Sequence, residues 1–101
     1  MKLSNSQAVY VLYNPEFNIT KIGVSENIKI RKSALEMACG CKLELVYATE
    51  PLVLALIYEK NAHEALKQHR RVGEWFNVSN SNLLYIDSTA SGDKCSIYYE
   101  V

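Results

Sequence analysis

The chain has 101 residues, of which 49% are hydrophobic and 22% are charged, a composition typical of one folded domain and not of a disordered tail. Its eleven basic residues balance its eleven acidic residues. This balance excludes a protein that holds nucleic acid by bulk charge, because such binding needs many Lys and Arg contacts to phosphates. A nucleic-acid partner therefore requires a local patch.

No segment favours a membrane protein or a secreted one. Residues 1–7 are polar and lack the apolar stretch of a signal peptide, and the longest apolar run, 52–58, is too short to cross a bilayer. Three cysteines, an odd number, fit a reducing compartment better than a disulfide framework. We therefore expect a cytoplasmic protein with no membrane partner.

The first quarter of the chain predicts a β-hairpin. Residues 8–13 form an apolar run rich in β-formers, and residues 19–24 form a second such run across the turn-forming residues 14–18. Gly23 inside the second strand indicates a bulge or a close backbone approach.

A helix is predicted next, over about 26–37, with Ser25 as its N-cap and Gly40 ending it from the left-handed region. Its core-facing stripe is expected to contain Ile30, Ala34 and Met37, which recur at helical spacing.

Residues 42–49 alternate in polarity and predict a third strand. Thr49 is expected to cap a second helix that runs to about Arg70. The core-facing stripe of this helix is Leu52, Ala55, Leu56, Glu59, Ala62, His63 and Leu66. A carboxylate and an imidazole thus stand in an otherwise apolar stripe.

Residues 73–78 predict a final strand or turn, and 83–86 and 96–101 predict two more short strands. The order β-β-α-β-α predicts one α+β domain over 1–101, with a mainly antiparallel three-stranded sheet flanked by helices and a β-rich C-terminal extension over 80–101. The last strand could pair with that of a second copy, which predicts a homodimer.

Glu59 and His63 are the first candidates for chemistry, because side chains four residues apart on a helix project together. A carboxylate on an apolar face needs a cation, hydrogen bonds or a metal ion. One Glu can hold Mg²⁺ when a substrate phosphate completes the coordination shell. The alternative is an ion pair with Lys or Arg at the edge of the core.

Three further groups fit the handling of a phosphate. Arg31 on the first helix could bind a phosphate with two hydrogen bonds, or it could belong to a solvated helix face. Tyr10 and Lys21 lie on strands that the hairpin brings side by side. Their alternatives are a packed core tyrosine and a lysine on the open face of the sheet.

Together these segments resemble the GIY-YIG nucleases. The motifs that carry the resemblance are, in chain order, Ala8-Val9-Tyr10, Lys21-Ile22-Gly23, Arg31, Glu59 to His63 and Gly73-Glu74-Trp75-Phe76. The resemblance covers residues 8–79. Within the family, the chain looks most like the branch found in phage DNA-binding proteins and meiotically up-regulated fungal proteins.

The resemblance implies a phosphodiesterase that uses Mg²⁺ or Mn²⁺ and acts on DNA. Tyr10 would orient or deprotonate the attacking water, Arg31 would contact the scissile phosphate, and Glu59 would bind the metal. Lys21 replaces the Tyr of the second signature and could act as a base. His63 would be a proton shuttle or would support a metal ligand.

Departures from the family pattern leave two other functions open. Leu35 stands where the family more usually has His, and the late Asn of the family has Asn77 as its counterpart. The alternatives are a nucleic-acid-binding module without turnover and a protein-interaction regulator on the same scaffold.

Other side chains allow two interpretations each. A basic cluster could bind a DNA backbone or complement a helix dipole; it consists of Lys67, His69, Arg70 and Arg71. Trp75 and Phe76 could stack on a base, but closing the core is favoured. The cysteines are expected to be buried thiols and not zinc ligands; they are Cys39, Cys41 and Cys95.

Overall fold

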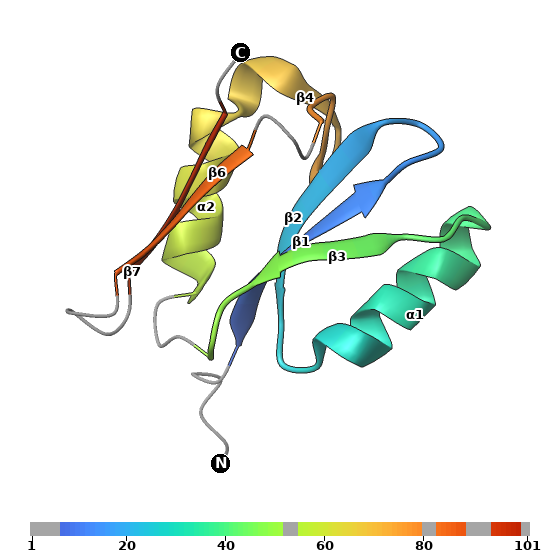
Figure 1. The fold of residues 1–101 in the computed structure, drawn as a ribbon, viewed down its shortest axis with the longest axis horizontal. Coiled ribbons are helices and arrows are strands. Elements are labelled where there is room, and N and C mark those ends of the chain that lie inside the picture. Colours follow the sequence, from blue (N-terminus) through green and yellow to red (C-terminus); the bar gives the residue numbers. More distant parts are fainter. Residues whose placement is uncertain (1–6, 52–54, 80–82, 89–93, 100–101) are drawn as a thin grey trace.

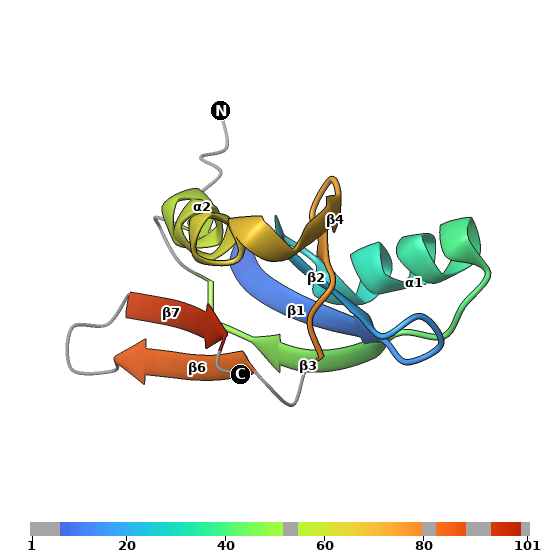
Figure 2. The ribbon, with the colours of Figure 1, turned by 90° about the horizontal axis from the view of Figure 1, so that it is seen from above.

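The computed structural model describes residues 7–51, 55–79, 83–88 and 94–99. Five strands form one sheet, and two more form a separate hairpin (Figures 1 and 2). The elements are β1 (Ala8–Asn14), β2 (Ile19–Ser25), α1 (Ile28–Cys39), β3 (Glu44–Ala48), α2 (Ala55–Ala65), the short 3₁₀ helix η1 (Lys67–His69), β4 (Arg70–Val72), β5 (Trp75–Phe76), β6 (Leu83–Ser88) and β7 (Lys94–Tyr99).

The large sheet has the strand order β3-β1-β2-β5-β4, and every neighbouring pair is antiparallel. The α+β fold is confirmed, and β3, β1 and β2 are the three predicted central strands. The segment predicted as a final strand or turn contains both a turn and β5, and it forms a short hairpin with β4 that adds two strands beside β2.

The β1–β2 hairpin sets the register of the two strands that carry much of the candidate site. Pairing is unbroken along both strands, so Gly23 makes no bulge. The side-chain oxygen of Asn14 accepts hydrogen bonds from the backbone N–H groups of Glu16 (3.0 Å) and Phe17 (3.3 Å). Asn18 completes the turn with a φ of 54°, a conformation that Asn tolerates better than most residues.

Alternate residues of β1 enter two different hydrophobic clusters, because successive side chains of a strand point to opposite faces. The cluster on the α2 side contains Val9, Val11, Ile22, Ala55, Ala62, Leu66, Phe76 and Val78. The cluster on the α1 side contains Tyr10, Leu12 and Leu43, with Ile28, Leu35 and Trp75 packed against it. One helix thus covers each face of the sheet.

Helix α1 begins two residues later than predicted. The predicted N-cap Ser25 is wrong, because the side chain of Asn27 accepts the hydrogen bond from the Ile30 N–H (3.1 Å). Ser25 instead accepts from the Asn27 N–H (3.0 Å). Gly40 ends the helix at a φ of 69°, as predicted.

The predicted core stripe of α1 is also wrong. Ile30 is 66% exposed and Met37 is 85% exposed, and Ala34 is exposed as well. Ile28 and Leu35, seven residues apart, face the sheet instead. Both sets have helical spacing, so periodicity alone does not decide which face of a short helix is buried.

Helix α2 differs from its prediction at both ends. Thr49 exchanges hydrogen bonds with the backbone of Val9, at 2.9 and 3.0 Å, and so extends the pairing of β3 with β1 instead of capping the helix. The helix ends at Ala65, and Arg70 begins β4. Ala55, Ala62 and Leu66 are buried as predicted; Leu56 is exposed, and Leu52 lies outside the described residues.

The two predicted C-terminal strands are confirmed, and they pair with each other as β6 and β7. This hairpin runs beside α2 (Figure 1). Pairing between two copies stays a prediction. No helix among the described residues is long and apolar enough to cross a membrane.

Candidate functional site

The candidate site lies where β2 extends beyond the short β4–β5 hairpin. β5 pairs with β2 only at Thr20 and Lys21, and the last contact is the hydrogen bond from the Ile22 N–H to the Glu74 carbonyl (3.2 Å). Gly73, with a φ of 57°, allows the chain to reverse tightly at this point. The turn of the hairpin therefore holds the Glu74 side chain near the middle of β2.

Tyr10 reaches this part of the sheet across Gly23. The two residues are directly opposite each other on β1 and β2, so their side-chain positions share one face of the sheet. A Cβ atom on Gly23 would lie 2.6 Å from the Tyr10 hydroxyl oxygen and 2.7 Å from Cζ. The close approach predicted at Gly23 is therefore the approach of the Tyr10 ring, and only glycine leaves room for it.

Lys21 is buried and ion-paired. Its Nζ donates to Glu74 Oε1 at 2.7 Å and lies 5.8 Å from the centroid of the Trp75 ring. A buried ammonium group needs such a partner, since an unpaired charge in the protein interior is costly. The pair connects the middle strand of the sheet to the turn of the β4–β5 hairpin.

Helix α2 supplies Glu59 and His63 from the opposite face of the sheet. His63 Nε2 lies 2.8 Å from the Ile22 carbonyl oxygen, and because a carbonyl only accepts, Nε2 carries the proton. The His63 ring also packs at 5.2 Å from the ring of Phe76. The imidazole is thereby held against the same part of β2 that the hairpin turn contacts.

Glu59, His63 and Glu74 form one cluster. One potential ligand atom from each lies within 4.8 Å of those of the other two. The pKa of Glu59 rises to about 7, first through burial and then through the charge of Glu74 and a hydrogen bond with it; Lys21 opposes the rise. Near neutral pH Glu59 therefore holds a proton beside the Glu74 carboxylate, which is itself paired with the Lys21 ammonium.

Tyr10 and Arg31 complete the site. The Arg31 guanidinium is close enough to the Tyr10 hydroxyl to affect its pKa. Burial raises the pKa of Tyr10, Arg31 opposes the rise, and the charges of Glu74 and Glu59 add to it. Tyr10 is therefore a phenol at neutral pH, suited to orienting a water molecule by hydrogen bonds.

The structure thus brings together the five side chains that were predicted as catalytic groups, which are Tyr10, Lys21, Arg31, Glu59 and His63. It adds Glu74, to which the sequence assigned no role. The available signal was its place in the Gly-Glu-Trp-Phe motif, an acidic residue directly after a turn glycine. Its proximity to Glu59 depends on the pairing of β5 with β2, which the sequence did not predict.

We expect Glu74→Gln to lower the pKa of Glu59 from about 7. The substitution removes the neighbouring negative charge, which raises this pKa, and keeps the Lys21 ammonium, which lowers it. The pKa should remain above the ordinary glutamate value, since burial contributes most to the shift. The measurement is an NMR titration of side-chain carboxyl carbons. Glu64→Gln, on the exposed side of the same helix, is the control, and an unchanged Glu59 titration in Glu74→Gln would contradict the cluster.

The predicted basic residues lie on η1 and β4; Lys67, Arg70 and Arg71 are exposed, and His69 is half-buried. Lys67 pairs with Glu64 at 2.7 Å, and Arg71 donates to the side chain of Asn77 at 3.4 Å. Arg70 is exposed on β4, in the hairpin that also carries Glu74. Their role in binding DNA stays a prediction.

The aromatic residues of the Gly-Glu-Trp-Phe motif close the core, as predicted. Phe76 is fully buried in the cluster on the α2 side. Trp75 packs against the cluster on the α1 side.

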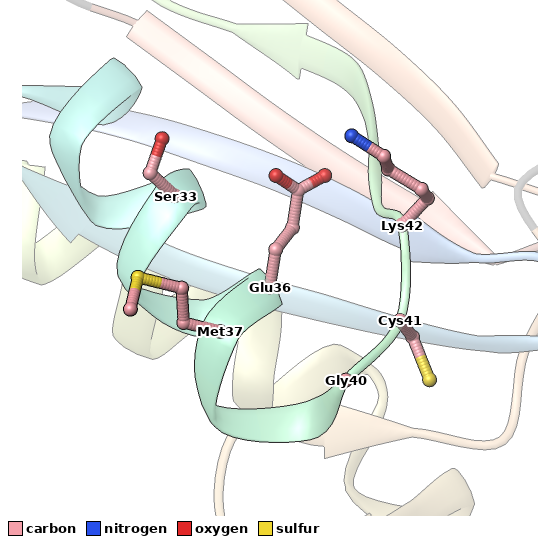
Figure 3. Close-up of a pocket in the computed structure, with 6 residues that line it drawn as sticks. All are labelled: Ser33, Glu36, Met37, Gly40, Cys41 and Lys42. Atoms are coloured by element: carbon pink, nitrogen blue, oxygen red, sulfur yellow. The ribbon is translucent and has the colours of Figure 1, made fainter.

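A separate hollow of about 470 Å³ lies at the end of α1 (Figure 3). Glu36 borders it and accepts hydrogen bonds from Lys32 Nζ (3.0 Å) and the Leu43 N–H (2.9 Å). Cys39 is exposed and Cys41 is half-buried, so the expectation of buried thiols is wrong for both. The Cys95 side chain lies outside the described part of the structure. The hollow shares no residue with the candidate site.

Comparison with known proteins gives one match. Residues 7–88 match the family model described as the T5orf172 domain, which is of the phage-type, endonuclease-like kind. The match includes all of the motifs and every side chain of the candidate site. No curated protein and no solved structure matches the chain.

Proposed function

We propose that this chain, which belongs to the T5orf172 domain family, is a metal-dependent endonuclease that hydrolyses DNA phosphodiester bonds. The observation that carries the proposal is the convergence of the Glu59, His63 and Glu74 cluster with Tyr10 and Arg31 at one part of the sheet. A nuclease-like family supports the same conclusion. The GIY-YIG resemblance stays a prediction that agrees with both.

The donor set fits a hard divalent cation. Carboxylate oxygens are the ligands preferred by Mg²⁺ and Mn²⁺. Glu59 and Glu74 place two carboxyl groups close together, and the charge of Glu74 contributes to the raised pKa of Glu59. A cation there would replace the proton that Glu59 holds. When bound, it would stabilise negative charge on the phosphate as a Lewis acid.

The side chains of the chain itself would divide the remaining tasks. Arg31 would bind a non-bridging oxygen of the scissile phosphate, and the Tyr10 hydroxyl would orient the attacking water. Since His63 keeps its proton on Nε2, the lone pair of Nδ1 can accept a proton from that water. Lys21 would hold Glu74 in place through their 2.7 Å ion pair.

One observation favours a second function, a nucleic-acid-binding module without turnover. The Lys21 ammonium already neutralises Glu74, so the cluster has an internal cation. In that case Glu59 and Glu74 would be structural, and Arg31 with the exposed residues Arg70 and Arg71 would bind DNA.

The deciding experiment is incubation of the full chain with supercoiled plasmid and with branched DNA in Mg²⁺ or Mn²⁺. We expect nicking that EDTA abolishes and that Arg31→Ala reduces by at least about a hundredfold, the effect of removing a strong charge-stabilising donor. Lys29→Ala, on the same helix and exposed, is the matched control. Salt-sensitive DNA binding without nicking would reject the nuclease in favour of the binding module.

A further inference from the structure

The turn that follows α1 holds two thiols that the proposed function does not use. Cys39 is the last residue of the helix and is exposed, and Cys41 is half-buried. Cys41 borders the hollow at the end of α1 (Figure 3). A small molecule in solution can therefore reach this turn at a place separate from the candidate site.

The backbone of the turn brings the two cysteines together. Gly40 has a φ of 69°, a left-handed conformation that turns the chain directly after the helix. Cys39 Sγ lies 3.7 Å from the Cys41 carbonyl oxygen, and Cys41 Sγ lies 3.5 Å from the Cys39 carbonyl oxygen. Each sulfur thus lies against the backbone of the other cysteine, and the Cys39 thiol is close enough to act on the pKa of the Cys41 thiol.

The spacing of the two cysteines permits a disulfide. Residues two positions apart have Cα atoms within roughly 7 Å of each other, and disulfides usually join Cα atoms about 4.4–6.8 Å apart. Gly40 places no side chain between the sulfurs, and apart from its two chain neighbours no described residue has an atom within 4 Å of where its Cβ would be. The turn is therefore free to adjust. A ring closed over one residue is strained, so its disulfide is readily reduced again.

The surroundings of the two thiols give them different roles. Cys39 is the more exposed, so an incoming molecule meets it first. The pKa of the Cys41 thiol is raised, first through Glu16 and then through burial, and this lowers its thiolate fraction and its reactivity toward molecules in solution. Once Cys39 is modified, attack by Cys41 is intramolecular, and the resulting high effective concentration compensates for a small thiolate fraction.

We infer that Cys39 and Cys41 form a redox-active dithiol site whose substrate is a small-molecule disulfide such as oxidised glutathione. The Cys39 thiolate attacks one sulfur of R–S–S–R, forms a mixed disulfide and releases the first RS⁻. The Cys41 thiolate then attacks the Cys39 sulfur, closes the protein disulfide and releases the second RS⁻. The two protein thiols lose two electrons and two protons, and the small disulfide is reduced to two thiols. This activity goes beyond the proposed function and does not depend on it.

The test follows the full chain by mass spectrometry. The reduced protein is incubated with oxidised glutathione, its remaining thiols are alkylated, and the intact protein and its peptides are measured. We expect the protein to lose the mass of two hydrogen atoms, the new bond to join Cys39 to Cys41, and dithiothreitol to reverse the change. Cys95→Ser removes the third cysteine of the sequence and is the matched control, which should form the same bond.

Two variants in the Cys95→Ser background separate the steps. Cys41→Ser should stop at a mixed disulfide on Cys39, formed at a rate within about twofold of the parent, whereas Cys39→Ser should react at least about tenfold more slowly. Equal rates of the two variants would overturn the assignment of the first step to Cys39. Circular dichroism establishes that both variants are folded.

The unmodified chain decides the inference without any variant. A mixed disulfide that persists at Cys39 or Cys41, a bond from either residue to Cys95, or the absence of any reaction would each overturn it. Cleavage of DNA plays no part in this measurement, so failure of the dithiol site and failure of the proposed nuclease are distinguishable.

Discussion

Glu59→Gln is expected to abolish metal-dependent cleavage and, at the same time, to make the metal-free protein more stable above pH 7. The loss of activity should reach at least about a thousandfold, because charge stabilisation by a bound cation contributes several kcal/mol and each 1.4 kcal/mol is tenfold in rate. The gain in stability has a different origin. A neutral amide can keep the hydrogen bond to Glu74 without requiring that two negative charges lie side by side.

The sign of the stability effect follows from the raised pKa. Glu59 titrates at about 7 in the folded chain against 4.5 in its ordinary state, so between these values the folded state binds more protons than the unfolded state. The free energy of unfolding therefore falls as the pH rises from 4.5 to 7. Since Glu59 is only half-buried, solvent screens part of this cost, and about 1 kcal/mol is expected at pH 8.

Thermal melts at pH 5 and pH 8 check this expectation. Glu59→Gln should melt about 4 °C above the unmodified chain at pH 8, and close to it at pH 5. Glu64→Gln removes an exposed carboxylate of the same helix and should leave cleavage intact. A Glu59→Gln variant that still cleaves like the unmodified chain would remove Glu59 from the proposed mechanism.

Gly23→Ala is expected to eliminate most of the cleavage activity through Tyr10. The added Cβ atom would lie 2.6 Å from the Tyr10 hydroxyl oxygen, far inside contact distance, so the buried ring must move. Displacing it would change the position of the Tyr10 hydroxyl relative to the Arg31 guanidinium, which acts on it. Overpacking of this kind typically costs about 1–3 kcal/mol of stability, and a misplaced catalytic group costs about a hundredfold in rate.

A double-mutant cycle shows whether the collision with Tyr10 is the cause. In a Tyr10→Leu background the shorter side chain no longer reaches across Gly23, so Gly23→Ala should then cost much less stability than it does alone. The measurement is urea unfolding of the four proteins. Equal costs of Gly23→Ala in both backgrounds would show that the glycine is needed for another reason.

The sequence predicted the parts of the site that local pattern controls. Alternation in β1 and β2 and the turn residues between them correctly placed Tyr10 opposite the second strand. Glu59 and His63, four residues apart, were correctly assigned to one side of a helix. The cluster around them was less predictable, because Glu74 reaches Glu59 only through pairing between β2 and β5, which are separated by about half of the chain.

The errors have a shared physical cause. Ser25, Thr49 and the stripe of α1 were interpreted from preferences within single segments. In the folded chain, Thr49 makes hydrogen bonds with the backbone of Val9. Tertiary packing places Leu35 against the sheet, whereas helical spacing alone also allowed Met37. Local preference is weak beside such long-range contacts.

The shortness of the β4–β5 hairpin has an evolutionary consequence. Lengthening this hairpin by one pair of residues would carry its turn past Ile22 and over the part of β2 where Glu59 and His63 of α2 lie near Glu74. Because the turn is at the surface, such an insertion would leave both hydrophobic clusters untouched. A longer hairpin would thus restrict access of a bulky polyanion to the site through a change in one loop, with the rest of the scaffold unchanged.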